Sequence, residues 1–241
     1  MADSKSVIPL ESNPQIFTDL AHKLGLSPIL QFHDVYSLTD PDLVAFLPQP
    51  IFGIILLFPL TPSYEAYRKR TDSQSQDYTN DNGNIKWFKQ TIRNGCGLYA
   101  LLHILANLSP DLNLSNSKIS DLVSKLDSNK SVGETSLLVE ELEKSIQLDE
   151  NYGSKGQTEA PEAGADVNLH FISFIKGTDD HLYELDGRRN GPIDLGPLSD
   201  SGKSNLIEEI KVSERIQFYI DNTDDENKHN FAIIAIGPTL D

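Results

Sequence analysis

Residues 90–108, QTIRNGCGLYALLHILANL, decide the fold, because a short polar lead passes into a run that is apolar almost throughout. The apolar side chains after Cys96 fall on nearly every side of a helix, which predicts a helix buried at the centre of the molecule. Asn94 is a favoured N-cap residue, so we expect Cys96 in the first turn of this helix. Unpaired backbone N–H groups and the helix dipole favour negative charge there, which suits a thiolate nucleophile.

Apolar patterns on both sides of this helix predict a mixed α/β (α+β) fold, with one domain over residues 1–241. Residues 51–58 are continuously apolar, as expected for a central strand buried on both faces. Residues 151–166, NYGSKGQTEAPEAGAD, lack any period and predict an unusual loop. Further strands are expected near residues 85–90, 168–175, 182–186, 216–220 and 231–236, and helices near residues 14–24, 41–47, 62–69, 114–126, 134–148 and 204–211.

Composition narrows the class of protein. The formal net charge is -16, which argues against nucleic acid as a partner, because proteins that bind it concentrate Lys and Arg. The single cysteine excludes an internal disulfide, and no apolar stretch reaches the length of a membrane helix. The chain starts without a signal-peptide pattern, so we expect a cytoplasmic or nuclear protein with no membrane partner. We find no metal-ligand spacing, phosphate loop or dinucleotide fingerprint and expect no cofactor.

A cysteine nucleophile needs a base, and the chain offers six histidines. His170 stands early in a strand that enters a predicted hairpin. If the turn centres on Thr178, His170 lies opposite Asp186, since both are eight positions from it. Directly opposed side chains are about 5 Å apart, so this carboxylate would orient the imidazole. A one-residue slip would reverse the facing, and a strand histidine unrelated to Cys96 is the alternative.

An acyl-transfer enzyme also needs donors for the oxyanion that forms on the attacked carbonyl. The N–H of Cys96, at the start of the helix, is one candidate. The side-chain amide of Gln90, six residues earlier, is the second. The alternative for Gln90 is a solvated side chain at the end of a strand.

Short blocks spread nearly from end to end resemble the ubiquitin C-terminal hydrolase family, and its small fungal members in particular. The most specific are Gln90 with Cys96-Gly97 after five intervening residues, the Leu-His-Phe triplet 169–171, and the Leu-Asp-Gly-Arg quartet 185–188. The other matching positions are residues 9–14, 34–36, 56–59, 159–161 and His103.

The resemblance implies a role for each candidate group. The nucleophile, the base and acid, its orienting carboxylate and the oxyanion donor are expected to be Cys96, His170, Asp186 and Gln90. The implied partner is ubiquitin, whose C-terminal tail is basic, and the residues expected to bind it are Glu11, Asp34, Asn94 and Leu169. Gly95 departs from the family, which usually has a small residue with a side chain at this position.

The fold that the resemblance implies is a papain-like cysteine protease core. It has a central, mostly antiparallel sheet flanked by helices, a knotted backbone, and a crossover loop over the active site at residues 151–166. Doubled back between its anchors, such a loop leaves an opening that a folded domain of 100 residues would barely pass. Small or unfolded leaving groups are therefore expected.

The expected activity is that of a monomeric, thiol-dependent deubiquitinase, which cleaves peptide, amide or ester adducts after the terminal glycine of ubiquitin. Three alternatives stand beside it. They are a hydrolase for a ubiquitin-like modifier, another Cys-His-Asp transferase, and a ubiquitin-binding protein without catalysis.

Overall fold

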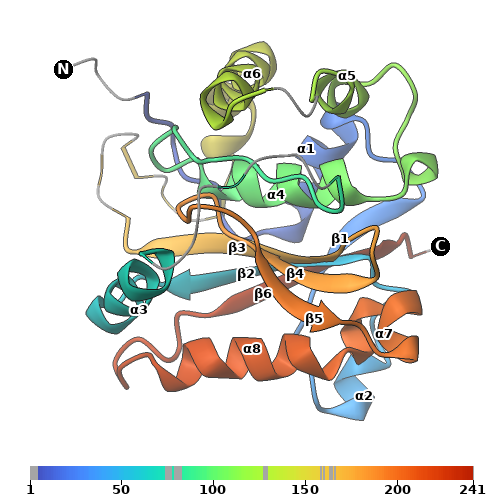
Figure 1. Cartoon of the computed structure of the whole chain (residues 1–241), viewed down its shortest axis with the longest axis vertical. Helices are drawn as coiled ribbons and strands as arrows, with labels where there is room; N and C mark the ends of the chain where they lie inside the picture. Colours follow the sequence, from blue (N-terminus) through green and yellow to red (C-terminus); the bar gives the residue numbers. More distant parts are fainter. Residues whose placement is uncertain are drawn as a thin grey trace.

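The computed structural model is a six-stranded antiparallel sheet with helices on both faces (Figure 1). It describes residues 5–73, 78, 83–126, 130–157, 159, 161, 162, 165 and 167–240. The strands lie in the order β1-β6-β2-β3-β4-β5. Their bounds are β1 Leu30–Asp34, β2 Gly53–Pro59, β3 Leu169–Lys176, β4 His181–Leu185, β5 Ile193–Pro197 and β6 Ala232–Pro238. The predicted mixed fold with an antiparallel sheet is confirmed.

The helices form two layers, one on each face of the sheet (Figure 1). One layer holds α1 (Pro14–Leu24), α4 (Cys96–Asn107), α5 (Lys118–Ser124) and α6 (Val132–Ile146), and the other α2 (Pro41–Val44), α7 (Asp200–Ser204) and α8 (Ile210–Asp221). Helix α3 (Pro62–Asp72) follows β2 directly and lies beside the end of the sheet. Short 3₁₀ turns cover Pro110–Leu112 and Leu206–Glu208, and a π-helical turn covers Asp149–Gly153.

Strand β2 is central, as its continuous apolar run predicted. It lies between β6 and β3, and its side chains alternate between two cores. Ile55 belongs to the core beneath α4, whereas Ile54 and Leu56 belong to the core beneath α8. A strand with apolar partners on both faces needs no polar alternation.

Helix α4 is buried from Cys96 to Ala106, as the sequence predicted. It packs on β3 and β2 and carries apolar side chains on almost every side. This burial places the first residue of the helix, Cys96, against the start of β3. The position of the cysteine is thus fixed by the core of the molecule.

The predicted strand at residues 85–90 is wrong. Its main chain is paired by side chains of α4 in place of a neighbouring strand. Asn107 accepts from the N–H of Lys86 at 2.7 Å and donates to its carbonyl at 2.8 Å, and His103 bonds the main chain of Phe88. An extended segment whose polar groups are already satisfied needs no sheet.

The predicted strand at residues 216–220 is also wrong, because these residues lie in α8. The buried side chains Val212, Ile216 and Tyr219 are spaced by four and three residues, which is the period of a helix. The short apolar window concealed that period. Among the described residues, no helix has the length and apolar character needed to cross a bilayer.

Candidate active site

Cys96 is the first residue of α4 and is 8% exposed. The N-cap is Gly95, so the prediction that Asn94 caps the helix is wrong. Asn94 instead takes a left-handed conformation with φ 59°, which Asn tolerates better than most residues, and its side chain donates to the carbonyl of Ala165 at 3.1 Å. Cys96 keeps the predicted place at the positive end of the helix dipole.

His170 and Asp186 lie within hydrogen-bonding distance of each other. The Nε2 of His170 donates to Oδ1 of Asp186 at 2.7 Å, and both side chains are almost fully buried. The remaining ring nitrogen, Nδ1, is free to serve the thiol of Cys96, which lines one cavity with His170 and lies close enough for each group to shift the pKa of the other. The sulfur, the imidazole and the carboxylate therefore lie together in one site, with the imidazole between the other two groups.

The register of the β3–β4 hairpin differs from the predicted one by two residues. Ser173 pairs with Leu185, so His170 and Asp186 are not directly opposed. Strand β4 ends at Leu185, and Asp186 reaches the imidazole from the loop that follows. A shift of two keeps side chains on the same face, which is why the contact survives the error.

The carboxylate of Asp186 has two further donors. The hydroxyl of Tyr64 donates to Oδ2 at 2.6 Å, and the N–H of Arg188 donates to Oδ1 at 2.8 Å. Burial raises the pKa of Asp186, but the charge of His170 and these hydrogen bonds outweigh burial and hold that pKa well below its usual range. Asp186 therefore remains a fixed negative charge beside the imidazole.

His170 and Cys96 each shift the pKa of the other. Burial lowers the pKa of His170, yet the charge of Asp186, and then the contact with Cys96, outweigh burial and raise that pKa to about 9. Burial raises the pKa of the Cys96 thiol, but His170 and the N–H groups of Phe171 and Gly97 more than offset this and lower it below the ordinary 9.0. The site therefore favours a thiolate beside an imidazolium.

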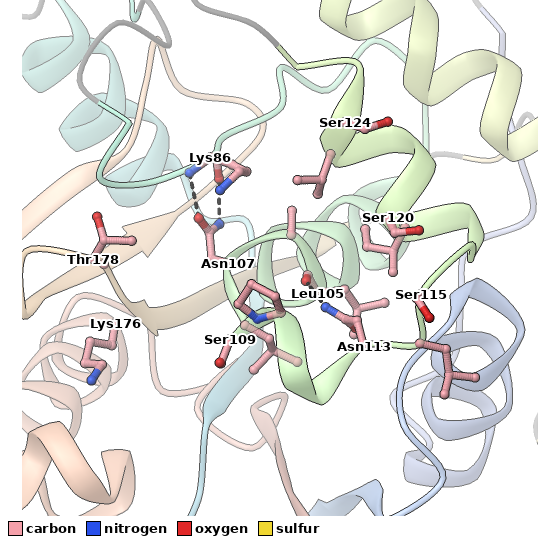
Figure 2. Close-up of a pocket in the computed structure, with 17 residues that line it drawn as sticks. Lys86, Leu105, Asn107, Ser109, Asn113, Ser115, Ser120, Ser124, Lys176 and Thr178 are labelled. Atoms are coloured by element: carbon pink, nitrogen blue, oxygen red, sulfur yellow. Dashed lines mark hydrogen bonds between the residues drawn. The ribbon is translucent and has the colours of Figure 1, made fainter.

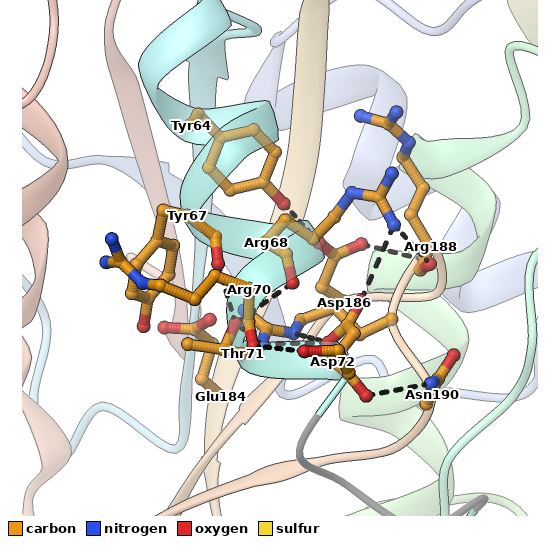
Figure 3. Close-up of polar contacts among 12 residues, drawn as sticks. Tyr64, Tyr67, Arg68, Arg70, Thr71, Asp72, Glu184, Asp186, Arg188 and Asn190 are labelled. Atoms are coloured by element: carbon orange, nitrogen blue, oxygen red, sulfur yellow. Dashed lines mark hydrogen bonds and ion pairs between the residues drawn. The ribbon is translucent and has the colours of Figure 1, made fainter.

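Helix α3 holds the loop that carries Asp186 (Figure 3). Arg68 donates to the carbonyl of Arg188 at 3.5 Å, and Arg189 donates to Asp72 Oδ1 at 2.9 Å. Asn190 donates to the carbonyl of Asp72 at 3.3 Å. With Tyr64, these contacts fasten both ends of α3 to the segment that follows β4.

Gln90 lies beside the same loop. Its N–H donates to the carbonyl of Gly187 at 2.8 Å, and its side-chain Nε2 donates to the carbonyl of Ile92 at 3.0 Å. A Cβ at position 187 would lie 2.9 Å from Cβ of Gln90, so this close approach requires glycine. The Nε2 carries a second hydrogen, and Gln90 lines one cavity with Cys96 and His170.

Two open cavities meet at Cys96. One, of about 300 Å³, is lined by Leu10, Glu11, Leu57, Gly156, Pro161, Val167, Leu169, Phe171 and neighbours, and the other, of about 420 Å³, by Leu60, residues 90–94, Val167, Leu169, His170 and Arg188. Leu169 borders both, Glu11 the first and Asn94 the second. Asp34 lies exposed at the end of β1 and lines neither. Cys96 thus lies where the two cavities meet, and the two together form one groove.

Described residues of the predicted loop at residues 151–166 form part of the wall of the first cavity, although residues 151–153 lie in the π-helical turn and not in a loop. Gly153, Gly156 and Pro161 line this cavity, and a Cβ at Gly156 would lie 2.4 Å from Oε2 of Glu11. Residues 158, 160, 163, 164 and 166 of this loop lie outside the described residues, and with them the path on which the expected knot depends.

Sequence reasoning missed Tyr64. Its position in a predicted helix did not indicate a contact with any catalytic candidate, because Tyr64 and Asp186 are 122 positions apart in the sequence. Another cavity, of about 750 Å³, lies at the opposite end of α4 from Cys96, between that helix, α5 and the β3–β4 turn (Figure 2). Within the described part of the chain, no cluster of His, Cys, Asp and Glu could hold a metal ion.

Alkylation will report the lowered pKa of the thiol directly, because Cys96 is the only cysteine. We expect the rate of modification by iodoacetamide to rise with a midpoint below 9.0, since the thiolate already forms at lower pH. Replacing His170 by asparagine removes the largest influence that opposes burial, so the midpoint will move upward. A midpoint that stays in place in His170→Asn would contradict the pairing.

A family model and similar known proteins all match the chain over most of its length. The family model described as ubiquitin carboxyl-terminal hydrolase, family 1, matches residues 7–221. The chain is 40% identical over 243 residues to ubiquitin carboxyl-terminal hydrolase YUH1 of Saccharomyces cerevisiae, covering 98% of both chains. It is 31% identical over 238 residues to a ubiquitin carboxyl-terminal hydrolase of Drosophila melanogaster, covering 95% of this chain and 96% of the relative.

A solved structure shares the fold. The catalytic domain of Trichinella spiralis UCH37, bound to ubiquitin vinyl methyl ester, superposes with a TM-score of 0.69. The match covers 97% of this chain and 96% of that one at 22% identity.

Proposed function

Because the chain belongs to ubiquitin carboxyl-terminal hydrolase family 1 and is a thiol-dependent hydrolase, we propose that Cys96, His170 and Asp186 cleave the bond after the terminal glycine of ubiquitin. The observation that carries the assignment is the imidazole of His170, which lies beside the thiol of Cys96 in one cavity and is hydrogen-bonded to the carboxylate of Asp186. A nucleophile, a base and a group that orients the base are the parts that acyl transfer requires.

The Cys96 thiolate attacks the carbonyl carbon of the terminal glycine and forms a tetrahedral intermediate. The free hydrogen of the Gln90 amide and the N–H of Cys96 stabilise its oxyanion. His170 gives its proton to the leaving amine, which departs and leaves a thioester on Cys96. The neutral imidazole then takes a proton from water, the hydroxide attacks the thioester, and ubiquitin leaves with a free carboxylate. Asp186 keeps the imidazole oriented throughout.

A ubiquitin with a thiol-reactive vinyl group at its C-terminus tests the assignment. We expect one covalent adduct with the wild type, located at Cys96 by peptide mass analysis, and none with Cys96→Ala. The absence of an adduct with the wild-type protein would refute the assignment. An adduct formed instead by the corresponding probe of a ubiquitin-like modifier would move the substrate to that modifier.

The cavity lined by Glu11 and Leu169 suits the extended tail that precedes the reacting glycine. Its walls are largely apolar, and Glu11 adds a carboxylate at its border. A basic tail would gain from that charge and from the net charge of -16, which speeds the encounter of opposite charges. Asn94 lines the cavity on the leaving-group side and also holds Ala165. Asp34, exposed on β1, is proposed to contact the body of ubiquitin.

A preference for small or unfolded leaving groups is supported by Gly153, Gly156 and Pro161, described residues of the loop at 151–166 that line this groove. Inserting ten Gly and Ser residues after Gln157 will give a flexible, wider loop and raise the cleavage of folded ubiquitin conjugates by about tenfold. Cleavage of a small ubiquitin amide will stay within about twofold, since the chemistry is unchanged. The same insertion after Asp225, between α8 and β6, is the control. Equal rates for both insertions on folded conjugates would contradict the gating role.

A further inference from the structure

One face of α4 carries three polar side chains spaced by four residues: Tyr99, His103 and Asn107. Residues four apart lie above one another on a helix, so the three form a row along its length. The row faces residues 86–92, which run alongside the helix toward Cys96. Each of the three side chains holds the main chain of this segment.

Asn107 holds the far end of the segment. It makes the two main-chain bonds to Lys86 described above and shown as dashed lines in Figure 2, and its amide also donates to the carbonyl of His103 at 2.7 Å. His103 accepts from the N–H of Phe88 at 3.0 Å. Its ring is parallel to that of Phe88, with centroids 5.7 Å apart.

His103 holds Phe88 as a neutral ring. The ring is fully buried, and burial lowers the pKa of His103 to about 4, against the smaller opposing influence of the Phe88 carbonyl. Only a neutral imidazole offers an acceptor nitrogen to an N–H donor. This histidine is therefore unsuited to the proton transfers that His170 performs.

Tyr99 holds the end of the segment next to the site. Its hydroxyl oxygen accepts from the N–H of Thr91 at 3.2 Å, and the same hydroxyl lies 3.3 Å from the Thr91 side-chain oxygen. The tyrosine ring is 1% exposed, so the hydroxyl has a fixed position. Gln90 directly precedes Thr91.

We propose that Tyr99 and His103 are positioning residues for Gln90, and this inference rests on the oxyanion role proposed above. Gln90 lies between Phe88 and Thr91, and both are held by the helix that carries Cys96. The position of Gln90 relative to the sulfur is thereby tied to a single helix, α4, which carries Tyr99, His103 and Cys96. A displacement of about 1 Å in such a site can cost about 100-fold in rate, so fixing it matters to catalysis.

A double-mutant cycle tests the inference. Gln90→Ala will lower kcat for a small ubiquitin amide by about 100-fold with little change in KM, since an oxyanion donor acts in the transition state. Tyr99→Phe will lower kcat by about fivefold, and His103→Leu by more, because the donor is displaced and not removed. Added to Gln90→Ala, neither change will lower kcat by more than about twofold, as expected for residues that act through Gln90.

Tyr183→Phe is the matched control. Tyr183 is a buried tyrosine whose hydroxyl donates to Asp179 at the β3–β4 turn, away from Gln90, so kcat will not change. Thermal unfolding shows whether each variant is folded, and if His103→Leu does not fold, the isosteric Tyr99→Phe decides alone. A loss from Tyr99→Phe that is equally large with and without Gln90→Ala overturns the positioning role only. A kcat unaffected by Gln90→Ala overturns the oxyanion role and the inference together.

Discussion

Cys96→Ala will lower kcat for hydrolysis of a fluorogenic ubiquitin amide by about 10⁵-fold, because no other group in the site replaces the nucleophile. The same variant will bind ubiquitin with a Kd within about threefold of the wild type, since the lost sulfur contributes little to a large interface. Stopped assays at high enzyme concentration give the rate, and calorimetry gives the affinity.

Two outcomes would contradict this prediction. A residual kcat within about tenfold of the wild type would mean that another group attacks the carbonyl. A loss of activity accompanied by loss of ubiquitin binding would point to a misfolded groove, which the thermal unfolding curve of the variant would reveal. Cys96→Ser provides the graded case, with a hydroxyl in the same position.

Asp186→Asn will lower kcat by about 10³- to 10⁴-fold and shift its pH dependence. The imidazolium of His170 persists below its pKa of about 9, so wild-type activity falls as the pH rises through that value. Without the charge of Asp186, burial lowers the pKa of His170, and the fall in activity will begin at a lower pH. A pH profile of kcat/KM, compared between the two proteins, measures the shift.

The exposed pair of His181 and Asp194 offers a control of the same chemistry. Its Nδ1 and Oδ2 are 2.9 Å apart on the β4–β5 ribbon, outside the cavities that meet at Cys96. Asp194→Asn will leave kcat and the pH profile unchanged. A descending limb that stays near pH 9 in Asp186→Asn would refute the assigned coupling between carboxylate and imidazole.

Helix α4 and strand β2 could be predicted because the extent of each apolar run indicates the length of the element, and its uninterrupted apolar character indicates burial on all sides. The hairpin that joins His170 to Asp186 was predicted with its facing correct and its register displaced by two. Turn geometry at Asp180, which has φ 61°, sets that register, and a sequence pattern gives no measure of it.

The errors share a physical cause. The segment at residues 85–90 has a strand-like composition, but its partners are side chains of α4, and only the tertiary fold brings them together. Tyr64 was missed for the same reason, since only the tertiary fold brings it from α3 to Asp186, which lies in the loop after β4. Strand β5 (Ile193–Pro197) was not anticipated, because its glycine and proline are typical of turns.

The packing interface between α4 and β3 also affects catalysis, because it sets the position of the nucleophile relative to the base. His170 lies on β3 and Asp186 directly follows β4, the partner strand of β3, whereas Cys96 belongs to the helix that packs on β3. If the helix shifted along Phe171 and Ile175, the distance between the Cys96 sulfur and the His170 imidazole would change, although neither side chain would itself be altered. Packing at this interface therefore sets the distance between sulfur and imidazole. A substitution that removes a buried methyl group there, far from the thiol, would lower kcat before any other property changes.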